Sequence, residues 1–300
     1  MAKELSAIVP TILRTHGDDI QKDEELQYGL GINPIFEKKI KITINKKNHL
    51  IALTDTVKQC YTDYGISISK ISIIPNGIKT SLFNIESNKN YIRNKYGIKD
   101  GQIFILSVGS YHIKKGYEYI PCAIKYLRNL NYDIKWLIIG KGMDKIKPLI
   151  IENDVSQQII FEEEITFTNL PKDNEVPSFP DRSLVSIYKS ADLFVMPSII
   201  ETFGMVLIEA MAAGLPIITT NAPGCRDVVS NNYNGILVAP KNPEALAKGI
   251  LRVIENPGLK NSLIKNGKNS IIKYDWGNIT QEYEHLYYHI VGKKRLRSKN

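Results

Sequence analysis

The sequence of 300 residues lacks a run of about 18 apolar residues, so no segment of it predicts a membrane-spanning helix. The apolar stretch at residues 5–13 is short and has charged residues but no cleavage-like site after it, which argues against a signal peptide. Cysteine is scarce as well: Cys60, Cys122 and Cys225 lie far apart. Their odd number and wide spacing exclude a disulfide framework and a zinc site. We therefore expect a soluble, cytoplasmic protein of about two domains.

Charge of one sign is not concentrated in the body of the chain, although the formal net charge is +8. The basic cluster that stands out is the C-terminal tail, with Lys293, Lys294, Arg295, Arg297 and Lys299. This tail could contact anionic lipid at the inner face of a membrane. A solvated, frayed terminus is the alternative that we favour. Zinc-finger spacings and recognition-helix patterns are absent, so nucleic acid is not an expected partner.

What the sequence does contain is an alternation of short apolar runs with segments of helical period, which favours an α/β fold with parallel sheets. Strands are expected at residues 7–15, 49–53, 71–74, 103–108, 134–139, 159–161, 192–196, 217–220 and 235–238. Helices are expected at residues 36–45, 55–64, 91–96, 116–130, 143–153, 183–190, 203–213 and 243–255.

The polar segment at residues 78–100 is interpreted as a hinge, so a small, incomplete first domain (1–79) precedes a larger Rossmann-like domain (80–275). Residues 276–300 are expected to form a closing helix and the basic tail. One face of that helix would carry Trp276, Ile279, Tyr283, Leu286, Tyr287 and Ile290.

The segment at residues 197–220 is the most informative part of the chain. It is interpreted as a strand end, a tight loop, a helix from about Phe203 to just before Gly214, and a second strand. Glu209 is the only charged residue between Phe203 and Thr220. Because an unpartnered buried charge is very costly, this carboxylate must be solvated or paired.

Glu201, Met205 and Glu209 are spaced by four residues, so the amides of Gly204 and Met205 and the Glu209 carboxylate are expected to face the same opening. Free N–H groups at a helix start bind phosphate. A carboxylate one turn further along the helix would suit the hydroxyl groups of a sugar or ribose. The alternative is a surface helix with one solvated glutamate.

Two further loops follow expected strands. Gly109 ends the strand at 103–108, where the backbone can approach a ligand, and Lys115 lies just before the next helix, where a cation can neutralise an anion. An ordinary strand–loop–helix turn is the alternative for this loop. His16 lies in the loop after the first strand, and open α/β sheets bind ligands at such loops. A functional histidine and a structural loop histidine are equally good interpretations of His16.

These motifs resemble those of the group 1 retaining glycosyltransferases. The resemblance covers roughly residues 8–290. It rests on Ile74-Pro-Asn-Gly77, Gly109…Lys115-Gly116, Pro197-Ser198, the E-x7-E pair Glu201 and Glu209, and Glu209-Ala-Met-Ala-Ala-Gly-Leu-Pro216. It implies a GT-B architecture of two facing Rossmann-like domains, with a nucleotide-sugar donor bound by the second domain.

The resemblance also implies roles for individual residues. Glu209 would hold the ribose, Lys115 would contact the diphosphate, and Glu201 would hold the donor sugar together with the amides near 203–205. His16 would face the sugar from the first domain, and the closing helix would cross back onto that domain. The candidate catalytic residues are Glu201, Lys115 and His16, and the candidate donor-binding residues are Gly109, Ser110, Lys115, Phe203, Gly204, Met205 and Glu209.

An Asp-x-Asp triplet does not occur in the chain, and this triplet is the usual metal-holding device of the other large glycosyltransferase fold. Its absence favours a mechanism without a metal or other cofactor, in which a cation and helix-start amides stabilise the departing diphosphate. The family analogy also suggests that the anomeric configuration is retained.

Two departures from the family pattern bear on function. Ser110 stands where the family usually has arginine, so one diphosphate cation is missing or is supplied elsewhere, for example by Lys114. His16 lies close to the start of the sequence, whereas the family's first domain normally has extra strands and an acceptor loop before this histidine.

Three interpretations of the function follow from these observations. The leading one is an enzyme that moves a hexose-type sugar from a nucleotide diphosphate to a glycan or lipid-linked acceptor in cell-envelope synthesis. The second is a nucleotide-sugar-binding subunit that is non-catalytic or needs a partner chain to complete its first domain. A nucleotide-sugar epimerase on the same architecture is a third, and the local motifs disfavour it.

Overall fold

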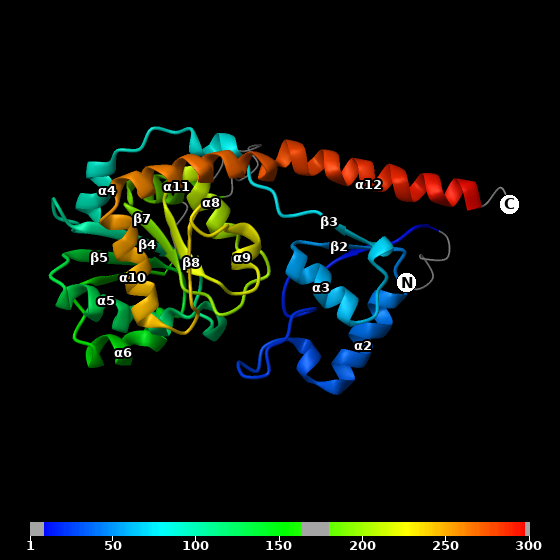
Figure 1. Cartoon of the computed structure of the whole chain (residues 1–300), viewed down its shortest axis with the longest axis horizontal. Helices are drawn as coiled ribbons and strands as arrows, with labels where there is room; N and C mark the ends of the chain where they lie inside the picture. Colours follow the sequence, from blue (N-terminus) through cyan, green and yellow to red (C-terminus); the bar gives the residue numbers. More distant parts are fainter. Residues whose placement is uncertain (1–8, 164–179, 298–300) are drawn as a thin grey trace, which may run out of the picture. The chain divides into compact units, whose positions relative to one another are not determined.

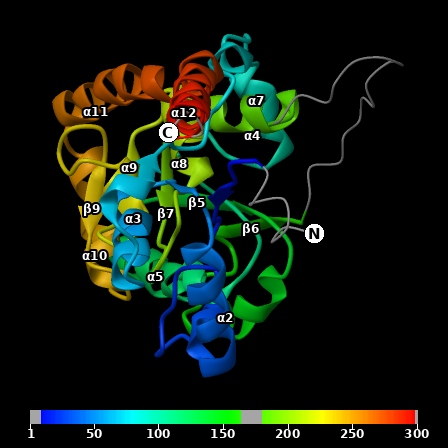
Figure 2. The same cartoon turned by 90° about the vertical axis from the view of Figure 1, so that its right-hand side faces the viewer.

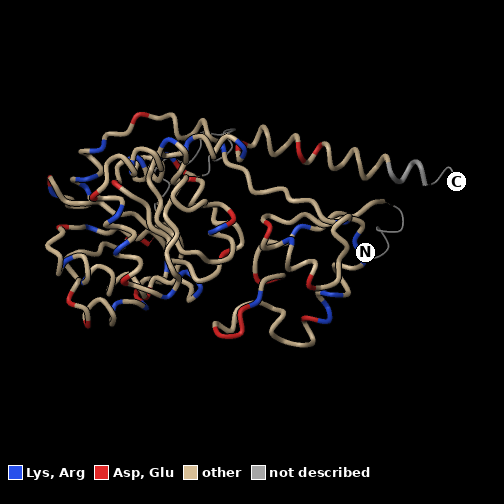
Figure 3. Tube along the Cα trace, viewed as in Figure 1, with Lys and Arg blue, Asp and Glu red and all other residues tan. Residues whose placement is uncertain are grey.

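The computed structural model of the protein describes residues 9–163 and 180–297, with the side chains of the basic tail left out. The chain forms two compact units (Figure 1). The first comprises the described residues up to Ile78 together with Glu201–Phe203 and the chain from Lys273 onward. The second comprises Lys79–Ile200 and Gly204–Ile272. Figure 3 shows acidic and basic positions interspersed along both units.

The first unit contains a parallel sheet in the order β1–β2–β3. Its strands are β1 (Ile12–Arg14), β2 (His49–Ala52) and β3 (Ile71–Ile73). Its helices are α2 (Pro34–Asn45), α3 (Asp55–Asp63) and α12 (Trp276–Arg297), with 3-10 turns at Leu30–Ile32 and Ile68–Lys70. Residues 7 and 8 of the expected first strand lie outside the described residues.

Side chains of β2 alternate between two small cores, one on each face of the sheet, as successive residues of a strand must. Leu50 belongs to the core formed with α2 and α3, which includes Ile44 and Val57. Ile51 belongs to the other core, where it packs with Ile279 and other residues of α12. Both faces of the three-stranded sheet are therefore covered, as parallel sheets require.

The expected apolar face of α12 is partly wrong. Ile279 and Leu286 are buried, and Tyr283 and Ile290 are partly buried beside them. Trp276 and Tyr287, by contrast, are about half exposed. The buried and partly buried residues are spaced by four, three and four positions, which leaves Tyr287 on the flank of the stripe and Trp276 at the helix start.

The second unit contains a six-stranded parallel sheet in the order β6–β5–β4–β7–β8–β9. Its strands are β4 (Ile103–Val108), β5 (Ile134–Ile139), β6 (Ile159–Glu162), β7 (Leu193–Met196), β8 (Ile217–Thr220) and β9 (Ile236–Val238). Counted within this unit the order is 3-2-1-4-5-6, which is the Rossmann arrangement. The expectation of an α/β fold with parallel sheets is thus confirmed.

Helices cover both faces of this sheet (Figures 1 and 2). They are α4 (Lys89–Lys95), α5 (Ile120–Asn129), α6 (Lys147–Glu152), α7 (Arg182–Ser190), α8 (Met205–Ala213), α9 (Cys225–Val228), α10 (Pro243–Ile254) and α11 (Pro257–Ser270). Within the part of the chain that the structure describes, no helix is both long and apolar enough to cross a membrane.

Three helical expectations for the second unit need correction. The helix expected at 116–130 begins at Ile120, because two short 3-10 turns occupy residues 113–119. The helix expected to start near Phe203 begins at Met205, after Gly204 in a left-handed conformation. The helix α11 was not expected at all, since its sequence is polar, contains two glycines and buries only Leu263 and Gly267.

Candidate functional site

The second sheet has its topological switch point between β4 and β7, which are adjacent in the sheet although β5 and β6 lie between them in the chain. Ligands of open α/β sheets bind in the crevice at the carboxyl ends of such strands. The loop after β4 runs over residues 109–116, and the loop after β7 runs over residues 197–204. Both loops carry residues that the sequence singled out.

Backbone contacts join these two loops within the second unit. The Ile199 amide donates a hydrogen bond of 2.7 Å to the Lys114 carbonyl oxygen. Gly116 has a φ of 66°, and a Cβ added to it would collide with the Pro197 carbonyl oxygen. Lys115 therefore belongs to a loop that is fixed against the chain leading toward α8.

Substitution of Gly116 by alanine should disturb this junction. We expect Gly116→Ala to destabilise the protein by more than about 2 kcal/mol, because left-handed strain adds to the collision with Pro197. Gly97→Ala is the matched control, since Gly97 has a φ of 62° and open space around its Cα. Chemical denaturation of both variants measures the difference, and equal losses of stability would show that the contact with Pro197 is easily relieved.

Gly109 lies where the loops after β4 and β5 meet. It has a φ of 141°, and its carbonyl oxygen accepts a hydrogen bond of 3.0 Å from the Tyr117 hydroxyl. A Cβ on Gly140 would collide with the same carbonyl group. The next residue, Ser110, is exposed and brings no charge. The close backbone packing explains both glycines, whereas no sequence motif points to Tyr117.

The start of α8 offers backbone donors. Its N-cap is Gly204, which has no side chain to accept hydrogen bonds from the first turn, and that turn contains no acidic residue. Ser198 lies in the loop leading to it, and its buried Oγ has no hydrogen-bond partner among the described residues. The amides of Met205 and Val206 in this first turn are suited to an anionic ligand.

Glu209 is buried, with 3% of its surface exposed, one turn into α8. The Tyr188 hydroxyl on α7 donates a hydrogen bond of 2.9 Å to its Oε2 atom. Burial raises the pKa of the Glu209 carboxyl above its ordinary value, and the Tyr188 hydrogen bond offsets part of that rise. Twenty-one residues separate the two side chains, and no local pattern in the sequence could have paired them.

Glu201 and Phe203 belong to the first unit. Glu201 is buried, and its Oε1 atom accepts a hydrogen bond of 2.9 Å from the Thr202 amide. Gln21 holds the same segment twice, because its Nε2 atom donates to the Glu201 carbonyl at 2.9 Å and its Oε1 atom accepts from the Thr202 hydroxyl at 2.8 Å. No motif in the sequence points to Gln21. The Phe203 ring packs edge-on against Tyr274 with centroids 5.5 Å apart.

His16 is exposed, in the loop that follows β1. The amides of His16 and Gly17 donate to the Asp19 carboxylate at 3.0 and 2.8 Å, which holds the loop in a tight turn. Buried Gly17 lies near the Tyr28 hydroxyl, the nearest atom to a Cβ built on it. The exposed imidazole is thus carried on an ordered turn.

The structure distributes the candidate residues between the two units. Those in the second unit are Gly109, Ser110, Lys115, Gly204, Met205 and Glu209, and those in the first are His16, Glu201 and Phe203. Over residues 9–163 and 180–297, no group of three His, Cys, Asp or Glu side chains is placed to hold a metal ion.

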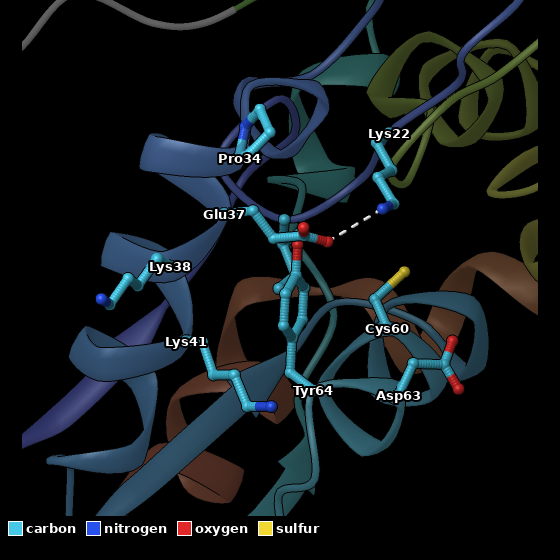
Figure 4. A pocket seen from close by; sticks show the side chains of 9 residues that line it. Lys22, Pro34, Glu37, Lys38, Lys41, Cys60, Asp63 and Tyr64 are labelled. Carbon is cyan, nitrogen blue, oxygen red and sulfur yellow. Dashed lines mark hydrogen bonds and ion pairs between the residues drawn. The ribbon is translucent and has the colours of Figure 1, made fainter.

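A cavity of about 650 Å³ lies in the first unit, between α2, α3 and the loop after β1 (Figure 4). This volume is in the range of small-molecule sites. Lys22 donates to Glu37 at 2.9 Å across one side of the cavity. The lining also includes Lys38, Lys41 and Tyr64. Burial raises the pKa of the Tyr64 hydroxyl above its ordinary value.

Comparisons with known proteins point to one family. The sequence profile described as "Glycosyl transferases group 1" matches residues 88–270. An uncharacterized glycosyltransferase of Methanocaldococcus jannaschii is 33% identical over 224 residues, which cover 73% of this chain and 54% of that protein. A UDP-Gal:alpha-D-GlcNAc-diphosphoundecaprenol alpha-1,3-galactosyltransferase of Escherichia coli is 29% identical over 234 residues, with 74% and 55% covered.

Among solved structures, the Anabaena protein HepE, crystallised in complex with UDP, has a TM-score of 0.80 at 17% identity. The match covers 95% of this chain and 74% of that one. The chain therefore spans about half the length of these two curated relatives and about three quarters of this structural neighbour.

Proposed function

Because the chain belongs to the family of group 1 glycosyl transferases and has the GT-B fold, we propose that it moves a hexose-type sugar from a nucleotide diphosphate to an acceptor. The observation that carries the proposal is the set of groups gathered at the switch point of the Rossmann sheet. The start of α8 has no side-chain cap, and Glu209 is buried one turn further along this helix. The loop after β4, which carries Lys115, is hydrogen-bonded to the loop after β7 that leads to α8.

The donor site has three parts in this proposal. The start of α8 binds the diphosphate, and Lys115 neutralises it. Glu209, oriented by Tyr188, accepts hydrogen bonds from the ribose hydroxyls. Glu201 contacts the donor sugar, and Gln21 and Thr202 position it. His16 is proposed as a further residue that contacts the donor sugar.

The chemical step breaks the bond between the anomeric carbon and the diphosphate, which leaves with both bonding electrons. Negative charge grows on the diphosphate oxygen, where Lys115 and the amides of Met205 and Val206 stabilise it. The acceptor hydroxyl oxygen forms the new bond to the anomeric carbon, and its proton passes to water. We propose that the configuration is retained and that no metal takes part, because a lysine and backbone donors are available for the leaving group.

The acceptor is proposed to be a glycan or lipid-linked sugar of the cell envelope. The name of the Escherichia coli relative, which acts on a diphosphoundecaprenol-linked sugar, supports this class. Such an acceptor would bring the protein to the cytoplasmic face of the membrane. Exposed, uncharged Ser110 favours a second candidate, a donor-binding subunit that needs a partner chain for transfer.

A panel of nucleotide sugars tests the proposal. We expect one donor to raise the melting temperature by several degrees, because bound ligand stabilises the folded state by mass action. The same donor should support transfer to a lipid-linked acceptor, with equal rates in EDTA and in magnesium. Failure of every nucleotide sugar to bind would contradict the proposal. Donor binding and hydrolysis without transfer would favour the partner-dependent subunit, and loss of activity in EDTA would contradict the metal-free step.

A further inference from the structure

The helix α2 exposes apolar side chains on the side that faces away from its core and on one flank. Ile35 is 66% exposed, and Phe36 and Ile42 are each 43% exposed. Ile40 and Ile44, by contrast, pack in the core of the first unit. Because Ile35 and Ile42 are seven residues apart, they lie on one side of the helix, opposite Ile44. A single exposed isoleucine is common on protein surfaces. Ile35 and Ile42 on one side of the helix, with Phe36 beside them, form an exposed apolar patch.

Lysines surround this apolar stripe. Lys38, Lys39 and Lys46 are exposed, and their positions along the helix place them on the same outward side as Ile35 and Ile42. Residues 34–47 contain five lysines and the single carboxylate of Glu37, a net charge of +4. Glu37 is engaged by Lys22 beside the cavity. We call Ile35, Phe36, Lys38, Lys39, Ile42 and Lys46 the α2 face.

We propose that the α2 face binds the surface of an anionic lipid membrane, with the helix lying parallel to the membrane plane. Apolar side chains of a surface helix enter the boundary between headgroups and acyl chains, while lysines contact lipid phosphates. Lys39 is suited to both environments, because its Nζ atom lies 5.4 Å from the centre of the Phe36 ring. A helix of 12 residues is about 18 Å long, too short to cross a bilayer.

Charge complementarity favours an anionic membrane over a second copy of the chain as the partner of the α2 face. Two α2 faces brought together would oppose lysine to lysine, whereas anionic headgroups neutralise them. Figure 3 shows the basic positions along this helix. Lys38 also lines the cavity of Figure 4, so the α2 face is continuous with the part of the first unit that is hollowed.

Sedimentation with vesicles tests the proposal on the full chain. We expect binding to phosphatidylcholine vesicles that contain phosphatidylglycerol, with affinity falling as sodium chloride rises. The double variant Ile35→Ser/Ile42→Ser should lower the affinity at least tenfold. The triple variant Lys38→Gln/Lys39→Gln/Lys46→Gln should lower it up to roughly a hundredfold, at about fivefold for each lysine.

Matched controls keep the test specific. Ile68→Ser and Ile151→Ser remove isoleucines that are 64% and 73% exposed elsewhere, and both variants should bind like the unchanged protein. A variant with the five basic residues of the C-terminal tail changed to glutamine should keep most of the affinity. Melting temperatures within a few degrees of the unchanged protein confirm that each variant is folded.

Three results would overturn the proposal. The first is equal binding to vesicles of pure phosphatidylcholine, and the second is loss of binding in the tail variant with no effect of the α2 variants. The third is a dimer that depends on Ile35 and Ile42 in sedimentation equilibrium, without vesicle binding. No donor or acceptor is present in these measurements, so their outcome is independent of the proposed transfer activity.

Discussion

Lys115→Ala should lower the rate of sugar transfer by about two to three orders of magnitude, with a much smaller loss of donor affinity. The reason is that charge on the leaving diphosphate grows toward the transition state, so a nearby cation stabilises that state more than the bound donor. The loop that carries Lys115 is fixed to the chain after β7 through Lys114 and Ile199. The lysine thus needs little reorganisation during the reaction.

Single-turnover kinetics and donor titration separate the two effects. Lys115→Arg should recover part of the rate, because a guanidinium group differs from an ammonium group in reach and shape. Lys125→Ala is the charge-matched control, since Lys125 is exposed on α5. Lys114→Ala tests whether Lys114 supplies the positive charge that the family's usual arginine would bring at the position of Ser110. If Lys114→Ala lowered the rate more than Lys115→Ala, the leaving-group cation would be Lys114 and our assignment would be wrong.

Most of the second unit could be predicted because its signals are local. Continuous apolar runs identified β4, β5 and β7, and Gly214 marked the end of α8 through its left-handed conformation. The predicted start of the helix at 116–130 was wrong, because local turns replace the first part of that helix. Residues 113–119 form 3-10 turns, although their composition is compatible with an α-helix.

The supporting residues of the site could not be predicted, since they depend on tertiary contacts. Gln21 holds Glu201 from a position 180 residues away, and Tyr188 reaches Glu209 from a different helix. Neither side chain belongs to a periodic or spaced motif. The helix α11 was missed for a different reason: helical period is weak where only one large apolar side chain, Leu263, is buried.

Glu209→Gln should have opposite effects on stability and on nucleotide binding. Burial raises the pKa of Glu209 in the folded protein above the ordinary value of 4.5. Below pH 4.5 the carboxyl is neutral in both the folded and the unfolded states, so it costs nothing there. As the pH rises from 4.5 to the elevated folded pKa, the unfolded chain ionises while the folded carboxyl stays protonated, so the folded protein loses stability, and the loss is complete above that pKa. Glutamine removes that loss and can still accept from Tyr188.

We therefore expect Glu209→Gln to raise the melting temperature at pH 8 and to leave it nearly unchanged at pH 4. Its affinity for the nucleotide diphosphate should fall roughly tenfold to a hundredfold, because a neutral amide replaces the charged acceptor of the ribose hydroxyls. Glu152→Gln, on the exposed side of α6, is the control and should change neither quantity. Calorimetry and melting curves at the two pH values measure both effects.

The combination of outcomes distinguishes two roles for the buried carboxylate. A variant that is more stable at pH 8 and binds nucleotide weakly carries the signature of a functional residue, because the protein tolerates a costly buried charge for the sake of its ligand. A variant that is less stable at both pH values and binds nucleotide normally would show instead that the Glu209–Tyr188 hydrogen bond serves only to join α7 to α8. That result would remove Glu209 from the donor site.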